Sequence, residues 1–335
     1  MNKYLFIFIV ILLSFDSSAT ALINSKEITK QRNCFSQIFA EHETWRSFIE
    51  NKLSKKFKSE DKLKKAMSGF DMRFTKNAFD KYKRNLLCSI FEYQVDGIDV
   101  NGYIIKPKEH KDKLPVLIYN RGGNGRYGLV VFGSMMNNLF SVADEGFVII
   151  GSQYRQSQKK GQLLDEFGGK DVKDVTELLK YISKIDGADP ERIGMFGASR
   201  GDMQTFLAAK QLKNIKAIAT IAGNSDLLKD LRFRPAMEKV YTRRIPNYDR
   251  NKVAELERRS VLRWTNELPP NTPILLLHGQ NDKRVSVQRS IELADALAQK
   301  NIPHKLVVYA NDNHGLMKNK AKADKELVTW FRKYL

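Results

Sequence analysis

Short, continuously apolar segments alternate with segments of helical periodicity over the C-terminal two thirds of the chain. Strands that are apolar at every position are buried on both faces, which is typical of parallel sheets covered by helices on each side. The sequence therefore predicts an α/β fold with a mostly parallel sheet. The expected strands are 116–119, 147–150, 192–196, 217–221, 274–277 and 306–309, and the expected helices are 130–142, 172–185, one starting near 199, 287–298 and 327–334.

A β-hairpin is expected just before this alternation. Residues 89–95 and 98–105 are rich in β-forming residues, and the pair Asp96-Gly97 between them is typical of a tight turn. We expect this antiparallel hairpin at the N-terminal edge of the sheet, so that the main domain spans residues 88–335.

Residues 22–87 are expected to form a small helical module. Their apolar residues recur at helical spacing and predict a helix over 35–53 that packs on the main domain. His42 falls on this apolar stripe and is expected to be a buried core residue. The stripe consists of Phe35, Ile38, Phe39, Trp45, Phe48, Ile49 and Leu53.

Residues 224–271 interrupt the alternation with a charged stretch between two sheet strands. We expect a helical insertion over the active site, where such segments set substrate choice. Arg232 and Arg234 in this insertion are candidates to hold a substrate carboxylate in bidentate fashion; the alternative is that these arginines only solvate the insertion.

Residues 1–21 have the pattern of a signal peptide. Lys3 precedes an apolar run over 4–13, and Ala-Thr-Ala at 19–21 is a small-residue cleavage site. We therefore expect an exported protein, periplasmic or extracellular, that begins at Leu22. An uncleaved anchor is the alternative, although a spanning helix takes about 20 apolar residues.

The chain contains two cysteines, Cys34 and Cys88. Export favours a disulfide between them, because oxidising compartments preserve such bonds. A bridge at these positions would join the N-terminal module to the main domain.

The net charge is +19, and residues 22–85 hold 16 Lys and Arg against 8 Asp and Glu. We interpret this excess as a solvated, lysine-rich surface, and contact with an anionic envelope surface is the alternative. Nucleic acid is not an expected partner, because the basic segment lacks a recognised binding motif or stacking platform. The sequence does not define an oligomeric state.

Residues 197–201 read Gly-Ala-Ser-Arg-Gly and fit the Gly-x-Ser-x-Gly pattern of a nucleophile elbow. The pattern needs small flanking residues because the serine lies in a strained turn between a strand and a helix. An apolar segment precedes it and residues of helical periodicity follow it, as this turn requires. We therefore predict Ser199 as the nucleophile of an α/β-hydrolase fold; the alternative is a serine that only caps a helix.

A serine nucleophile needs a base, and the base needs a carboxylate to orient it. His314 follows the last expected strand, and the active site of such a sheet lies at the carboxyl ends of its strands. Asp282 lies beyond the preceding strand, which gives the chain order serine, aspartate, histidine of this fold. Asp226 is the alternative acid, while Asp312 is too near His314 in sequence to face its ring.

The oxyanion formed in acyl transfer needs backbone donors. One is expected from the amide of Arg200, directly after the nucleophile. The other is expected from the loop that follows strand 116–119 and contains Arg121, Gly122 and Gly123.

The same loop contains a dinucleotide-like pattern, Gly-x-Gly-x-x-Gly at 123–128. A dinucleotide site also needs an acidic residue at the end of the next strand to hold a ribose, and that strand ends without one. No cofactor is predicted. No metal is predicted either, because His, Cys and carboxylate residues do not cluster at ligand spacing.

From about residue 90 to the C-terminus, these motifs resemble the catalytic domain of the prolyl oligopeptidase family of serine peptidases. The resemblance implies peptide hydrolysis through an acyl-enzyme. It rests on Asp189-Pro190-Glu191-Arg192-Ile193-Gly194 before the elbow, on His278-Gly279 with Asp282, on Asn313-His314-Gly315, and on Asp165-Glu166-Phe167-Gly168-Gly169 with Asp171 and Asp174.

The chain departs from the family pattern at two positions. Arg121 stands where the family usually has the histidine of His-Gly-Gly, and Asp202 replaces a second glycine after the elbow. Residues 22–87 are also too short for the β-propeller that restricts access in many family members. We predict cleavage of peptide or aminoacyl-ester bonds, with a carboxylesterase and an inactive binding protein of the same fold as alternatives.

Overall fold

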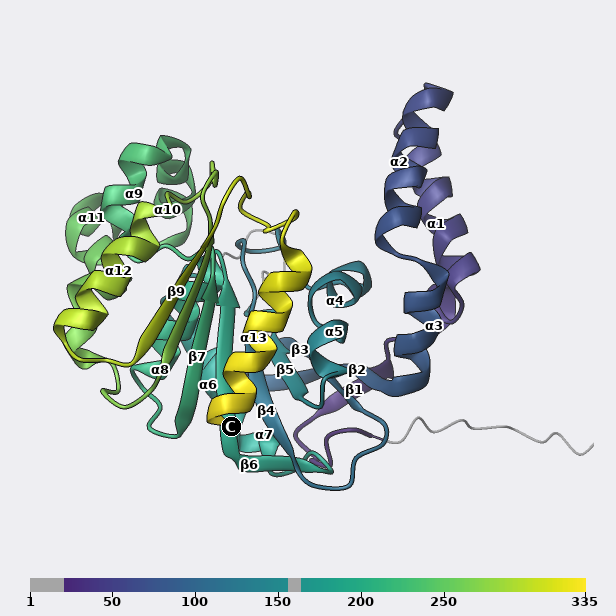
Figure 1. Cartoon of the computed structure of the whole chain (residues 1–335), viewed down its shortest axis with the longest axis horizontal. Coiled ribbons are helices and arrows are strands. Elements are labelled where there is room, and N and C mark those ends of the chain that lie inside the picture. Colours follow the sequence, from purple (N-terminus) through teal and green to yellow (C-terminus); the bar gives the residue numbers. More distant parts are fainter. Residues whose placement is uncertain (1–20, 156–163) are drawn as a thin grey trace, which may run out of the picture.

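The computed structural model describes residues 21–155 and 164–335, so the expected signal peptide, apart from Ala21, lies outside the described residues. The described residues form a nine-stranded sheet in the order β1-β2-β3-β5-β4-β6-β7-β8-β9 (Figure 1). Strands β4 to β9 pair in parallel, whereas β1, β2 and β3 make antiparallel pairs. The predicted α/β fold is confirmed. The strands are β1 Thr29–Asn33, β2 Leu86–Val95, β3 Ile98–Pro107, β4 Leu114–Asn120, β5 Val148–Ser152, β6 Ala188–Ala198, β7 Ile215–Ile221, β8 Ile274–Gly279 and β9 His304–Tyr309.

Helices cover both faces of the sheet (Figure 1). Val116 and Ile118 of β4 belong to the core on one face, and Leu117 and Tyr119 belong to the core on the other. Each strand residue therefore meets an apolar environment, which explains why this strand is apolar throughout. One face packs against α6 (Val172–Thr176), α7 (Leu179–Ile182), α8 (Arg200–Ala209) and α12 (Gln288–Gln299), and the other against α4 (Phe132–Asn138), α5 (Phe140–Ala143) and α13 (Lys320–Tyr334).

Two helices predicted as continuous are each divided into two. Leu139 has φ −121°, which ends α4 before α5 begins. Between α6 and α7, Leu178 and Lys180 donate their amides to the carbonyls three residues before them, so this turn is tighter than an α-helix. No helix of residues 21–155 or 164–335 is long and apolar enough to cross a membrane.

The N-terminal module contains α1 (His42–Ser54), α2 (Glu60–Arg73) and α3 (Lys76–Asn85), and α1 and α2 project beside each other away from the sheet (Figure 1). Arg46 of α1 forms an ion pair with Asp71 of α2 at 2.8 Å. His42 is buried, as expected, and its Nε2 lies 2.6 Å from the carbonyl oxygen of Phe74.

The prediction of one helix over 35–53 is wrong in about its first two turns, because α1 begins only at His42. The chain passes through a short 3₁₀ turn, Gln37–Phe39, before α1 begins at His42. Gln37 has φ +55°, and the amide of Phe35 donates to the side chain of Asn33 rather than to a helical carbonyl. Local side-chain bonding has displaced the helix start.

Strand β1 was not predicted from the sequence pattern. Its residues are polar and mostly exposed, so they show no alternation of buried and exposed positions. Strand β1 pairs with β2 and lies outside the predicted hairpin, which is therefore one strand inside the edge of the sheet. The predicted disulfide joins Cys34, just after β1, to Cys88 in β2, with 5.3 Å between the Cα atoms.

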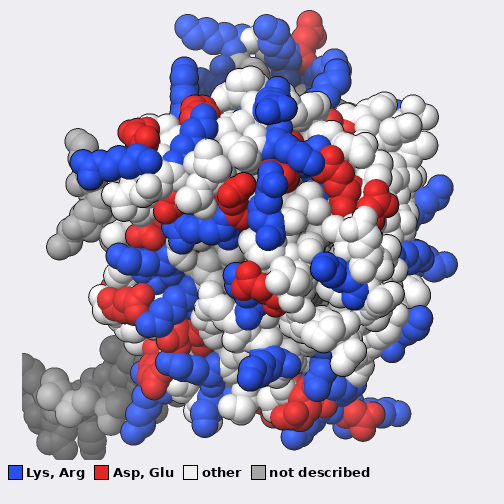
Figure 2. All heavy atoms as spheres, turned by 90° about the vertical axis from the view of Figure 1, so that its left-hand side faces the viewer, with Lys and Arg blue, Asp and Glu red and all other residues white. Residues whose placement is uncertain are grey.

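The insertion after β7 forms α9 (Leu227–Phe233), α10 (Glu238–Arg244) and α11 (Tyr248–Glu257). Its Leu231, Tyr241 and Leu256 belong to a small apolar cluster that also includes Phe167 and Met203 of the main domain. Figure 2 shows the side of the molecule that carries this insertion, with acidic residues interspersed among the lysines and arginines. On this face the basic excess is spread out rather than gathered in one patch.

Candidate active site

Ser199 occupies the tight turn between β6 and α8. Its φ of +58° and ψ of −122° are rarely adopted by a residue with a side chain, and the amide of Ser199 donates to the carbonyl of Ile221 at 2.8 Å. A Cβ at Gly197 would collide with the backbone of Gly201, and one at Gly201 would collide with the backbone of Asn120. The two glycines of the motif are therefore required by packing, and they present the serine at the carboxyl end of β6.

The side chains of His314 and Asp282 are hydrogen-bonded to each other. His314 Nδ1 donates to Asp282 Oδ2 at 2.7 Å. The other carboxylate oxygen, Oδ1, accepts the backbone amides of Arg284 and Val285 at 2.7 and 3.1 Å. Burial raises the pKa of Asp282, but hydrogen bonds from His278 and His314 lower it more, so the pKa lies below its usual range. The carboxylate is thus held in its charged form beside the imidazole.

The other candidate acids have different partners. Asp226 caps α9 by accepting the amide of Lys229 at 3.0 Å, and it forms an ion pair with Arg263 at 3.0 Å. Asp312 accepts backbone amides of its own loop, among them that of Asn319 at 2.8 Å. Asp282 is therefore the candidate acid that contacts His314, whereas Asp226 and Asp312 cap a helix and stabilise a loop.

Ser199 and His314 line one cavity of about 580 Å³. Its walls come from the loop after β4, the start of α8, the helices α9 and α10, and the loops after β8 and β9. Arg234 and Arg284 line the same cavity, whereas Arg232 is exposed and does not line it. Among the lining residues one carboxyl, Asp230, is present, and burial raises its pKa to about 6.

The loop after β4 packs directly against Ser199. A Cβ at Gly122 would lie 3.0 Å from the carbonyl oxygen of Ala198 and 3.2 Å from Ser199 Cβ. Gly123 has φ +75°, and a side chain there would also collide with the backbone of Tyr127. These glycines let the loop backbone approach Ser199, and with Arg200 they line the cavity.

Arg121 lies behind this loop rather than in the cavity. Its buried guanidinium donates to the carbonyl oxygens of Gly125 at 2.8 Å, of Tyr127 at 3.2 Å and of Gln153 at 2.6 Å. The dinucleotide-like pattern at 123–128 is therefore a loop wrapped around an arginine side chain, and α4 begins only at Phe132.

Arg200 belongs to a buried ionic cluster that the sequence did not predict. It donates to Asp165 and to Asp171, with Nη2 at 2.7 Å from each carboxylate. Asp165 also accepts the amide of Gly125, so the cluster connects the turn after Ser199 to the loop after β4. The acidic residues of the family-like segment at 165–171 were visible in the sequence, but no local pattern related them to Arg200.

Two further residues near the site had no predicted role. His278 is fully buried, with Nε2 at 3.2 Å from Asp282 Oδ2 and Nδ1 at 2.7 Å from Ser290 Oγ. Asp202 is buried in the first turn of α8 against Gly223, and burial raises the pKa of its carboxyl to about 7. Within residues 21–155 and 164–335, no group of three His, Cys, Asp or Glu residues is arranged to hold a metal ion.

The fold, the strained serine and the histidine–aspartate pair define a serine hydrolase of the α/β-hydrolase class. Residues 133–335 match the profile of the prolyl oligopeptidase family. The chain belongs to this family of serine peptidases, and the resemblance seen in the sequence is confirmed.

The relatives include proteins of similar and of much greater length. The chain is 26% identical to the uncharacterized peptidase YtmA of Bacillus subtilis over 242 residues, which cover 72% of this chain and 91% of that protein. It is 25% identical to the human acylamino-acid-releasing enzyme over 264 residues, which cover 72% of this chain but 35% of the relative. The chain thus matches only about a third of the length of the human relative.

Solved structures show the same fold. The acylaminoacyl peptidase of Pyrococcus horikoshii matches with a TM-score of 0.66 and 22% identity, over 78% of this chain and 44% of that one. A puromycin-hydrolyzing peptidase of Mycobacterium tuberculosis matches with a TM-score of 0.60 and 23% identity, over 74% of this chain and 40% of that one.

Proposed function

We propose that Ser199 attacks the carbonyl carbon of a peptide bond while His314 accepts its proton through Nε2. Asp282 holds the imidazole in the required tautomer through Nδ1. His314 then gives the proton to the leaving amine, and a water molecule releases the acyl group from Ser199 by the same steps in reverse. The observation that carries this proposal is the 2.7 Å contact between His314 and Asp282 at the cavity that also contains Ser199.

The tetrahedral oxyanion is proposed to bind to backbone amides. The amide of Arg200 is the first of α8 and has no acceptor within the helix. The second donor is proposed in the segment of Gly122 and Gly123, because this backbone packs against Ser199. The ionic cluster of Arg200, Asp165 and Asp171 supports both donors, since it joins the two segments that supply them.

The substrate is proposed to be a short peptide whose C-terminal carboxylate binds Arg234 and Arg284. Neither guanidinium forms an ion pair with another described residue, and both line the cavity of Ser199. A guanidinium binds a carboxylate through two parallel hydrogen bonds, which fixes its orientation as well as its position. Arg232, the other candidate, is not part of this proposal because it does not line the cavity.

A fluorophosphonate probe tests the proposed nucleophile. We expect covalent labelling of the full chain at Ser199 and no labelling of Ser199→Ala, which retains the fold. Equal labelling of both proteins would show that the probe reacts at another residue and would refute Ser199 as the nucleophile. Labelling of neither protein would favour an inactive binding protein. A labelled enzyme that hydrolyses nitrophenyl esters but no peptidyl nitroanilide would instead be a carboxylesterase.

We also propose that the protein is exported after cleavage before Leu22. The Cys34–Cys88 pair supports this, since disulfides persist in oxidising compartments and are rare in the cytosol. We expect N-terminal sequencing of the protein purified from the periplasm or medium to give Leu22 as the first residue. Recovery of the full-length chain from the cytosol alone would contradict export.

A further inference from the structure

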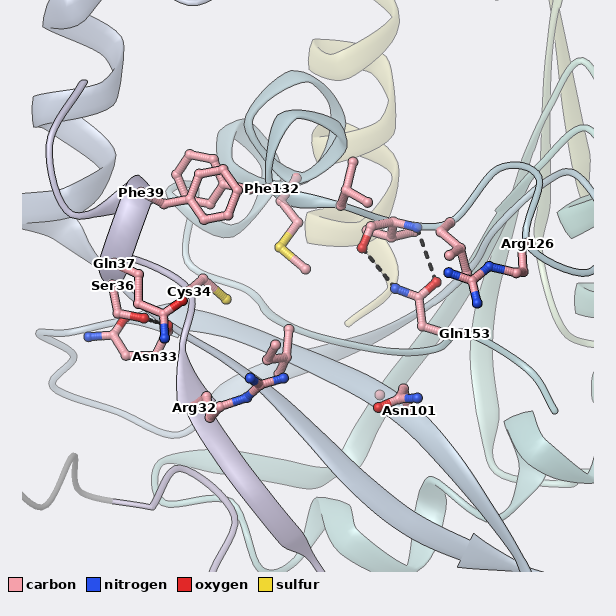
Figure 3. Close-up of a pocket in the computed structure, with 16 residues that line it drawn as sticks. Arg32, Asn33, Cys34, Ser36, Gln37, Phe39, Asn101, Arg126, Phe132 and Gln153 are labelled. Carbon is pink, nitrogen blue, oxygen red and sulfur yellow. Dashed lines mark hydrogen bonds between the residues drawn. The ribbon is translucent and has the colours of Figure 1, made fainter. Parts of the chain in front are cut away.

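A second cavity of about 580 Å³ lies beside the loop that follows β4, separate from the cavity of Ser199. Tyr127 of this loop lines the catalytic cavity, while its neighbours Arg126 and Leu129 line the second one. The remaining walls come from β1, β2, β3, the 3₁₀ turn after β1, Gln153 after β5 and the first turn of α4 (Figure 3). None of the proposed catalytic residues lines this second cavity.

The cavity is positively charged. Arg32 and Arg126 line it, and none of the described residues that line it is acidic. Both arginines are exposed, and neither forms an ion pair or a side-chain hydrogen bond with another described residue. Figure 3 shows that the two side chains come from different segments, Arg32 from β1 and Arg126 from the loop after β4. Two unpaired cations around one concavity favour an anionic ligand.

The wall opposite Arg32 is apolar. The rings of Phe39 and Phe132 stack with their centroids 4.6 Å apart (Figure 3), and Met135 also lines the cavity. Val130 also lines the cavity, and Ile90, which pairs with Arg32 across β1 and β2, adds apolar surface beside the arginine. Ligand sites typically combine such an apolar lining with a few charged groups that set orientation. The ligand that fits therefore has an apolar body as well as a negative charge.

The cavity is built from segments that are fixed in place. The disulfide at Cys34 ties the segment bearing Arg32 and Phe39 to β2. On the other side, the side chain of Gln153 accepts the amide of Val130 at 3.0 Å and donates to its carbonyl at 2.8 Å. A preformed site loses less conformational entropy when it binds a ligand.

We propose that this cavity is a second binding site, for small carboxylates that carry an aromatic or alkyl group. The carboxylate would bind Arg32 and Arg126, and the apolar group would pack against Phe39, Phe132 and Met135. The site is distinct from the proposed catalytic cavity and does not depend on its activity.

Calorimetric titration of the Ser199→Ala full chain tests the site without turnover. The probe is 4-phenylbutyrate. The neutral 4-phenylbutanol tests how much the negative charge of the probe contributes to binding, and acetate tests how much its apolar group contributes. We expect 4-phenylbutyrate to bind and 4-phenylbutanol, which lacks the negative charge, to bind at least about tenfold more weakly. Acetate, which lacks the apolar group, is not expected to bind detectably. Equal binding of the alcohol, or no binding of 4-phenylbutyrate at millimolar concentration, would overturn the proposal.

Variants locate the ligand. Arg32→Gln and Arg126→Gln, made in the Ser199→Ala background, are each expected to weaken 4-phenylbutyrate binding about tenfold. Both residues are exposed, so these variants are expected to fold. Arg73→Gln, an exposed arginine on α2, is the matched control and should bind as well as the parent. Arg234→Gln tests whether the probe occupies the catalytic cavity instead. Binding lost in Arg234→Gln and kept in the first two variants would place the probe in the catalytic cavity and refute the second site.

Discussion

Arg200 and Asp165 form a bidentate ion pair, with Nη1–Oδ2 at 2.8 Å and Nη2–Oδ1 at 2.7 Å. Both side chains are buried. Although burial raises the pKa of Asp165, the adjacent Arg200 guanidinium and backbone amides lower it more, so the carboxyl stays charged. The residue that follows Ser199 is thus fixed by a charge pair inside the protein.

Removal of the charge on Asp165 should destabilise the protein. In Asp165→Asn, Arg200 retains only Asp171 as a carboxylate partner, and breaking a buried pair costs about 3–5 kcal/mol. The measurement is the free energy of unfolding in urea at pH 7. The control is Glu326→Gln, which removes the half-exposed pair with Lys305 and should cost less than about 1 kcal/mol. Equal losses in the two variants would show that the buried pair has no special role.

Asp282→Asn should impair catalysis far more than changes at the alternative acids. An amide cannot hold the proposed tautomer of His314, and such a change lowers kcat by about 10⁴-fold in a serine triad. Asp226→Asn and Asp312→Asn, which remove a helix cap and a loop contact, are expected to change kcat by less than about tenfold. The comparison uses kcat on one peptidyl nitroanilide at pH 8. A loss at Asp226 as large as that at Asp282 would reassign the acid.

The sequence predicted the sheet well and the surroundings of the site less well. Strands such as β8 were identifiable because alternate residues enter two different apolar cores. Strand β1 was missed because an exposed edge strand needs no apolar side chains. The Asp282–His314 pair followed from chain order, which the fold fixes. Arg200 and Asp165 are 35 residues apart, and no periodic pattern relates residues that only tertiary packing brings together.

Reduction of the disulfide should lower stability. Cys34 and Cys88 are 54 residues apart, and the chain-entropy estimate for closing such a loop is about 4 kcal/mol as an upper value. The double variant Cys34→Ser/Cys88→Ser is therefore expected to unfold at lower urea concentration than the oxidised parent. Dithiothreitol should lower the midpoint of the parent and leave that of the variant unchanged. A parent midpoint that is insensitive to dithiothreitol at complete reduction would contradict this expectation.

Asp202 should make stability fall as the pH rises. Its pKa is about 7 in the folded protein, because burial raises it from 3.8. Between about pH 4 and 7 the unfolded chain has lost this proton while the folded protein still binds it, so folding becomes less favourable as pH increases. The full difference corresponds to roughly 4 kcal/mol at most.

Urea unfolding at pH 4.5 and pH 8 measures this effect. Asp202→Asn is expected to lose less stability between the two pH values than the parent protein. Asp230 contributes in the same direction, because burial raises its pKa to about 6, so part of the decline will remain. The control is Asp295→Asn, an exposed carboxyl on α12. An unchanged decline in Asp202→Asn would show that this carboxyl titrates near its ordinary pKa.

Arg234→Gln should reduce cleavage of peptides that end in a free carboxylate. The guanidinium lines the cavity of Ser199, so its loss removes a charge-assisted hydrogen bond worth about 1.5–3 kcal/mol, or roughly 10- to 100-fold in kcat/KM. The same peptides with an amidated C-terminus lack that charge and should be cleaved equally by parent and variant. Arg232→Gln is the matched control, because this neighbouring arginine is exposed and lies outside the cavity. If Arg234→Gln slows cleavage of both substrate series equally, the arginine shapes the cavity but does not bind the substrate carboxylate. If the parent protein hydrolyses nitrophenyl esters but cleaves neither peptide series, the peptidase assignment itself fails.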